Sequence, residues 1–319
     1  MTEPTAYRLA SYGDMIVDRE RMEPYARALR EVVRPRCIVL DVGAGTGIFS
    51  LLACRAGAGR VHAVEPDDAI EVARAAAAAN GFADRIVFHQ ALSRDVTLDE
   101  RADVVVSDLR GVLPLFQGHV PAVVDVRRRL LAPGGVLIPR RDTLWAAPLE
   151  DAKLRARCDE PWVRNEHGLD LRAGHDPVVN AWRRVSAKAE QLLAPPVRWA
   201  TLDYATIEFP GVAGEMEWVA ERAGAAHGLV VWFDAELAEG VGFSNAPGRP
   251  ELIYGQAFFP LREAVALAPG DRVRVELRAD LTGDDYTWQW RTQVFGGGGA
   301  ALSRADLRQS AFVGSALAP

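Results

Sequence analysis

A glycine-rich segment with a carboxylate on either side carries the clearest chemical signal in the sequence. Asp41 stands just before a run with glycine at every second position, Gly43, Gly45 and Gly47, and Glu65 ends the next short apolar run. Glycines let a backbone approach a ligand without a Cβ clash. Asp41 can hold an amino group or a bridging water, and Glu65 can accept both hydroxyls of a ribose. The pattern favours a sulfonium nucleoside, S-adenosylmethionine, although a nicotinamide enzyme would use Glu65 in the same way and a tight turn without a ligand is the structural alternative.

The elements around this segment alternate between strand and helix. Apolar runs without internal alternation are typical of parallel strands that are buried on both faces. They are expected at 37–42, 61–65, 86–89, 102–107 and 136–139, and helices at 18–33, 48–56, 69–79 and 120–131. This order predicts a doubly wound α/β sheet, Rossmann-like, with ligands at the carboxyl ends of its strands. The glycine segment and Glu65 lie at two such ends.

After about residue 140 the alternation of strands and helices gives way to strand-like runs separated by turns. The runs 227–234, 272–277 and 286–290 are expected to be antiparallel strands, since the last two alternate strictly and glycine and proline turns separate them. We therefore predict a cofactor domain over 1–140 and an all-β domain over 141–319. A helical pattern near 176–195 belongs to neither sheet.

Composition narrows the function classes. The net charge of -6 gives no support for a nucleic-acid partner. No apolar run approaches the ~20 residues that cross a bilayer, and the first residues lack a signal-peptide pattern. Three widely spaced cysteines, Cys37, Cys54 and Cys158, form no metal-binding pair. We expect a cytoplasmic protein without a metal site or a membrane partner.

The stretch Val39–Ser50 resembles the first motif of the protein arginine methyltransferases. Asp18-Arg19-Glu20-Arg21 is similar to that family's N-terminal helix, and 227–234, 241–244 and Gln256 match its second domain. The resemblance implies S-adenosylmethionine as the cofactor, with Arg21 paired to its carboxylate and Leu92 and Ser93 against its adenine. It also implies a β-barrel and a helical arm near 176–195 that makes a head-to-tail homodimer.

The resemblance breaks at the substrate loop, 107–111 and beyond. The family clamps a substrate guanidinium between two glutamates, and a gapless match places Asp108 and Gln117 there. A guanidinium is a rigid fork of donors that paired carboxylates meet best, and this site has one carboxylate. The family's threonine–histidine–tryptophan loop is replaced by a segment that ends in Tyr254. Tyr12 replaces a histidine, while Met15 fits its place.

We expect an N-methyltransferase that acts on an amino or guanidino nitrogen of a peptide or a small molecule, possibly a natural product. Asp108 would orient the acceptor and Gln117 would be a second anchor. His119 is a candidate base or a plain helix-end histidine, and Arg110 either attracts an acidic substrate or covers the loop. The candidate substrate contacts are Tyr12, Met15, Arg110, His119 and Tyr254. The alternatives are an O-methyltransferase and an inactive cofactor-binding scaffold.

Overall fold

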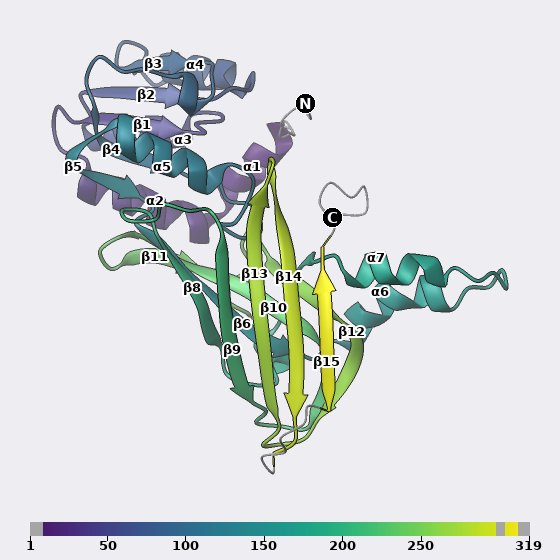
Figure 1. The fold of residues 1–319 in the computed structure, drawn as a ribbon. Coiled ribbons are helices and arrows are strands. Elements are labelled where there is room, and N and C mark those ends of the chain that lie inside the picture. The colour runs from purple at the N-terminus through teal and green to yellow at the C-terminus, as the bar shows by residue number, and fades with distance from the viewer. Residues whose placement is uncertain (1–8, 298–303, 312–319) are drawn as a thin grey trace.

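The computed structural model describes residues 9–297 and 304–311 and contains a parallel-sheet domain followed by a barrel-like domain (Figure 1). The parallel sheet has the strand order β3-β2-β1-β4-β5. Its strands are β1 (Ile38–Val42), β2 (Arg60–Val64), β3 (Ile86–His89), β4 (Ala102–Ser107) and β5 (Leu131–Ile138). The predicted α/β fold class is confirmed, because each neighbouring pair of these strands is parallel.

Helices cover this sheet because its strands are apolar on both faces. Helix α2 places Tyr25 and Leu29, both 0% exposed, in the core, and the Tyr25 ring stacks on Phe49 of α3 at 4.4 Å. Asp18 ends α1 and caps α2, since its carboxylate accepts the backbone N–H of Arg21 at 3.2 Å. The helices are α1 (Leu9–Val17), α2 (Arg19–Val32), α3 (Ile48–Ala56), α4 (Ala69–Ala79), the 3-10 turn η1 (Ser93–Asp95) and α5 (His119–Arg129).

The second domain consists of two antiparallel sheets that form one barrel-like body. One sheet has the order β7-β12-β10-β6-β8 with β11 paired to β10, and the other has the order β15-β14-β13-β9. Alternation places Tyr286, Trp288 and Trp290 of β14 inside. The strands are β6 (Arg141–Leu149), β7 (Arg183–Val185), β8 (Val197–Asp203), β9 (Val212–Val219), β10 (Gly224–Ala238), β11 (Val241–Ser244), β12 (Gln256–Leu267), β13 (Arg272–Thr282), β14 (Asp285–Phe295) and β15 (Ala305–Ser310).

A helical arm projects from the barrel, but not where the sequence predicted it (Figure 1). The arm contains α6 (Ala152–Val163), the turn η2 (Arg172–Gly174) and α7 (His175–Val179). The predicted helix over 176–195 is wrong beyond Val179, apart from the turn η3 (Ala189–Gln191). Strand β7 pairs with β12 there, and this long-range pairing outweighs the local helical pattern.

Among the described residues, no helix combines the length and the apolar character needed to cross a membrane.

Candidate active site

The glycine segment forms the turn between β1 and α3. Gly43, Gly45 and Gly47 have φ angles of 72°, 51° and 83°, a region that side chains with a Cβ rarely adopt. A Cβ on Gly47 would also lie 2.7 Å from the Cβ of Ala73 on α4. The glycines are therefore required by both backbone conformation and packing, and the turn that they form lies at the carboxyl end of β1.

Glu65 ties the end of β2 to this turn. Its Oε2 accepts the N–H of Gly45 at 2.9 Å, and its Oε1 accepts the N–H of Asp67 at 3.0 Å. Burial raises the pKa of Glu65 from its ordinary value, while these two backbone hydrogen bonds act in the opposite direction. Each oxygen keeps a lone pair beyond these bonds, so the carboxylate can accept further hydroxyl donors.

Asp41 lies beneath the turn with half of its carboxylate unsatisfied. The residue is 0% exposed and its Oδ2 accepts the Ser50 hydroxyl at 2.7 Å. Its Oδ1 has no hydrogen-bond partner among the residues that the structure describes. Burial raises the pKa of Asp41 to about 7. A buried, unpartnered carboxylate oxygen beside the glycine turn is suited to an amino group or an ordered water. Together with Glu65, whose free lone pairs can accept hydroxyl donors, the residues present fit S-adenosylmethionine.

Two side chains lie against the glycines of the turn. A Cβ built on Gly45 would come within 2.4 Å of the Tyr12 ring, and one on Gly43 within 2.3 Å of Leu109. Helix α1, which carries Tyr12, therefore lies over the turn. Leu92 and Ser93 follow β3 at the same edge of the sheet, and Leu92 is 40% exposed. Their contact with adenine stays a prediction.

Asp108 follows β4 and is held by several protein groups. Its Oδ2 accepts the Arg21 Nε at 2.7 Å and the Tyr254 hydroxyl at 2.5 Å, and its Oδ1 accepts Arg110 Nη1 at 3.0 Å. Burial alone would raise the pKa of Asp108, but the charges of Arg21 and Arg110 and the hydrogen bonds outweigh burial and leave it below its ordinary value. Arg21 also donates through Nη1 to the carbonyl of Met15 at 3.1 Å. Asp108 is therefore an ionised, oriented carboxylate.

Arg110 is an internal residue and not a surface cation. Its side chain is 0% exposed, and its Nε and Nη2 each donate to an oxygen of Asp142 at 2.8 Å. Its Nη1 donates to the Tyr25 hydroxyl at 2.7 Å. The prediction that Arg110 contacts a substrate is wrong for this arrangement, because burial and these partners keep the guanidinium from any ligand.

Gln117 and His119 differ in their exposure to solvent. Gln117 is half-buried, has a φ of 41°, and makes no side-chain hydrogen bond to a residue within the described ranges. His119, the first residue of α5, is buried with Nδ1 at 2.8 Å from the Pro114 carbonyl oxygen, and its Nε2 is unpartnered within the same ranges. Burial, with the charge of Arg110, lowers the pKa of His119 to about 4, so the imidazole is neutral.

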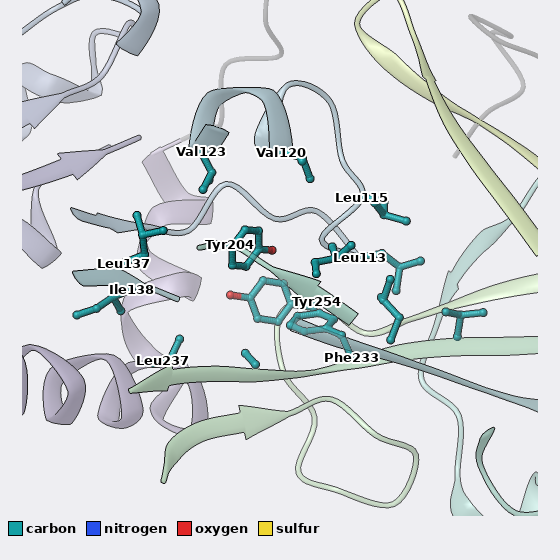
Figure 2. Close-up of a cluster of buried hydrophobic side chains, with 14 of the residues drawn as sticks. Leu113, Leu115, Val120, Val123, Leu137, Ile138, Tyr204, Phe233, Leu237 and Tyr254 are labelled. Carbon is teal, nitrogen blue, oxygen red and sulfur yellow. The ribbon is translucent and has the colours of Figure 1, made fainter. Parts of the chain in front are cut away.

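A cluster of buried polar side chains surrounds Arg110, and three of its residues, Tyr25, Asp142 and Tyr204, carried no individual prediction of a role in the site. Tyr25 lies in the helix expected at 18–33, which resembles the family's N-terminal helix, and was given no role of its own, while Asp142 and Tyr204 had no local signal. The Tyr204 hydroxyl donates to Asp142 Oδ2 at 2.5 Å. Figure 2 shows Tyr204 with Tyr254 and Phe233 near the loop that carries Leu113 and Leu115. The cluster therefore joins the parallel-sheet domain to the barrel.

Comparisons with known proteins identify relatives of both domains. The model of the ribosomal protein L11 methyltransferase (PrmA) family matches residues 26–139, and that of the arginine methyltransferase oligomerization subdomain matches residues 140–293. Protein arginine N-methyltransferase 6 of Danio rerio is 30% identical over 281 residues, 83% of this chain and 80% of that protein. A probable protein arginine N-methyltransferase 6 of Arabidopsis thaliana is 31% identical over 242 residues, and this match spans 71% of this chain but only 54% of that protein.

Solved structures share the fold. The Trypanosoma brucei PRMT1 enzyme–prozyme heterotetrameric complex with AdoHcy has a TM-score of 0.88 at 22% identity and covers 96% of this chain and 99% of that one. Protein arginine methyltransferase 10 of Arabidopsis thaliana has a TM-score of 0.86 at 20% identity and covers 95% of this chain and 98% of that one. At this identity the likeness bears on the fold alone.

Proposed function

Since this chain belongs to the protein arginine N-methyltransferase family and is an S-adenosylmethionine-dependent methyltransferase, we propose that its methyl acceptor is a guanidino nitrogen of an arginine side chain in a protein or peptide. The observation that carries the proposal is the ionised carboxylate of Asp108, which follows β4 at the sheet edge that also bears the glycine turn. A carboxylate at this place can bind and orient a guanidinium.

The cofactor-binding residues support the first half of the reaction. Asp41 offers an unpartnered oxygen to an amino group, and Glu65 offers lone pairs to ribose hydroxyls. Arg21 pairs with Asp108, and it can also pair with the carboxylate of the cofactor. When bound, S-adenosylmethionine supplies the electrophilic methyl group, and the chain's task is to hold the acceptor nitrogen in line with it.

The acceptor residues supply orientation more than proton transfer. The lowered pKa of Asp108 keeps it ionised, so it is a charged hydrogen-bond acceptor and a weak base. Gln117 is neutral, so it can accept one donor from a guanidinium but adds no charge. His119 is a weak base as well, because its pKa is lowered to about 4. The proton that the acceptor nitrogen loses therefore passes to water after methyl transfer.

We include in the proposal a homodimer formed through the arm of α6 and α7. The match of residues 140–293 to an oligomerization subdomain supports it. So do two exposed apolar side chains between the arm helices, Leu169 at 62% and Leu171 at 38% exposure. Covering these two exposed side chains with a second copy removes apolar surface from water, which is favourable.

Labelled S-adenosylmethionine tests the proposed acceptor. Wild-type protein is incubated with an arginine-rich peptide, the same peptide with lysine in place of arginine, and amine- and hydroxyl-bearing metabolites. We expect transfer to the arginine peptide alone, and loss of most turnover in Asp108→Asn with near-normal cofactor affinity. Transfer to a hydroxyl would favour the O-methyltransferase alternative. Tight cofactor binding without transfer to any acceptor would favour the scaffold.

A further inference from the structure

The buried guanidinium of Arg110 lies beside the carboxylate of Asp108. Arg110 meets Asp142 through two parallel hydrogen bonds of 2.8 Å, a fork geometry that fixes its plane. The remaining terminal nitrogen, Nη1, donates to the Tyr25 hydroxyl at 2.7 Å and to Asp108 Oδ1 at 3.0 Å. The Phe233 ring centroid lies 5.5 Å from the guanidinium carbon. Asp142, Tyr25 and Phe233 thus hold the guanidinium of Arg110 in place beside Asp108.

The hydrogen-bond capacity of Asp108 is unevenly used. A carboxylate has about four lone-pair positions, two on each oxygen. The Oδ2 atom accepts Arg21 Nε and the Tyr254 hydroxyl, and the Nη2 atom of Arg21 also lies 2.7 Å from it. The Oδ1 atom accepts Arg110 Nη1 among the residues that the structure describes. The capacity that is left for a ligand is therefore one position on Oδ1.

We propose that Arg110 is a positioning residue for Asp108: through Nη1 it fixes the plane of the carboxylate and leaves one hydrogen-bond position, on Oδ1, for the acceptor nitrogen. The inference rests on the proposed function, since it takes Asp108 as the group that meets the acceptor. Asp142 lies on β6 of the barrel, so the barrel sets the orientation of a carboxylate that follows a strand of the other domain. The acceptor guanidinium then meets Asp108 through a single contact and not a two-point fork.

The charges around Asp108 make this inference measurable. The titratable and charged groups that face it are Arg21 and Tyr25 of α2, Arg110 of its own loop, His119 of α5 and Tyr254 of the barrel.

Removal of the Arg110 charge leaves Arg21 as the remaining cation at the Asp108 carboxylate. The ionised form of Asp108 is then less favoured, so its titration moves to higher pH.

The test follows the carboxyl carbon of Asp108 by NMR against pH, in the full chain with adenosylhomocysteine bound and with the resonance assigned through Asp108→Asn. In Arg110→Gln we expect the midpoint to rise by about one pH unit or more. Arg110→Lys, which keeps the charge, should restore most of the wild-type midpoint. Tyr204→Phe is the matched control, because it removes a hydrogen bond to Asp142 without touching Asp108. An unmoved midpoint in Arg110→Gln overturns the proposal.

A second variant separates positioning from folding. Arg110→Gln leaves a buried Asp142 without its charge partner, which can destabilise the chain. The double variant Arg110→Gln with Asp142→Asn removes both charges, and a smaller rise in the Asp108 midpoint is expected, because the loss of the negative charge of Asp142 offsets part of the loss of Arg110. A double variant with the wild-type midpoint would contradict the role of Arg110.

Activity on an arginine peptide then tells the two proposals apart. If the wild type methylates no arginine peptide, the proposed function fails while the NMR midpoints still decide the role of Arg110. If the wild type is active, the acid limb of kcat/KM should move to higher pH in Arg110→Gln and return in Arg110→Lys. An acid limb that is unchanged in Arg110→Gln counts against positioning.

Discussion

The hydroxyl of Tyr254 lies 2.5 Å from Oδ2 of Asp108 and accepts a hydrogen bond from Arg21 Nε at 3.0 Å. A residue of the barrel thus contacts both Asp108, which we propose to orient the methyl acceptor, and Arg21, which is predicted to bind the cofactor. The Tyr254 ring is parallel to that of Phe243, with centroids 5.8 Å apart, so the hydroxyl is aimed by packing. Tyr254 completes the set of protein groups that hold Asp108.

Tyr254→Phe should lower kcat/KM because Asp108 loses a charge-assisted hydrogen bond. Such a bond is worth about 1.5–3 kcal/mol, which corresponds to roughly ten- to hundredfold in rate. Cofactor affinity should change little, since Arg21 keeps its bonds to Asp108. Steady-state kinetics with an arginine peptide and calorimetry with adenosylhomocysteine measure the two effects. A variant with full kcat/KM would show that the hydroxyl does not act through Asp108.

Glu65→Ala should weaken cofactor binding severely. The substitution removes the predicted acceptor of both ribose hydroxyls and also the partner of the Gly45 N–H. We expect affinity for adenosylhomocysteine to fall roughly hundredfold or more, as expected for the loss of charge-assisted bonds. Glu71→Ala on α4 is a matched control, because that side chain is 62% exposed. Equal affinities in the two variants would refute the placement of the ribose.

Asp41 should make the stability of the cofactor-free protein depend on pH. Its pKa rises to about 7 in the folded chain from an ordinary value of 3.8, so the folded state binds the proton more tightly than the unfolded state. The stabilisation from this proton is complete below pH 3.8 and is lost as pH rises through 7. Between those limits the wild type should lose roughly 1 kcal/mol per pH unit from this group.

Asp41→Asn carries no titrating carboxyl, so its free energy of unfolding should lack this part of the slope. Urea unfolding at several pH values between 5 and 8 measures the difference between wild type and variant. Parallel slopes in the two proteins would mean that Asp41 does not titrate in this range.

The positions of the glycine turn and of Glu65 could be predicted because each lies in a short, continuous stretch of sequence. Gly43, Gly45 and Gly47 form one turn, and Glu65 ends the adjacent strand, so local sequence and sheet topology together place them. Hydrophobic runs likewise predicted the strands of the parallel sheet. Strict alternation predicted strands within β13 and β14.

The acceptor half could not be predicted in the same way, because its residues come from distant strands. Asp142 and Tyr204 show no local pattern, yet they decide where Arg110 lies. A sequence cannot tell a buried arginine from an exposed one when its partner is more than thirty residues away. The same limit applies to β7, where pairing with β12 replaces the expected helix.

The arm gives the last prediction, which concerns assembly. Leu169 lies between the arm helices and is 62% exposed, so Leu169→Asp should leave folding intact while it adds a charge to the proposed dimer contact. We expect the variant to be monomeric, or to dimerise at much higher concentration, in light scattering coupled to gel filtration. Val219→Asp on β9 is the control, since Val219 is 53% exposed and lies on the barrel. If both variants remain dimers at low concentration, the dimer does not use the tip of the arm.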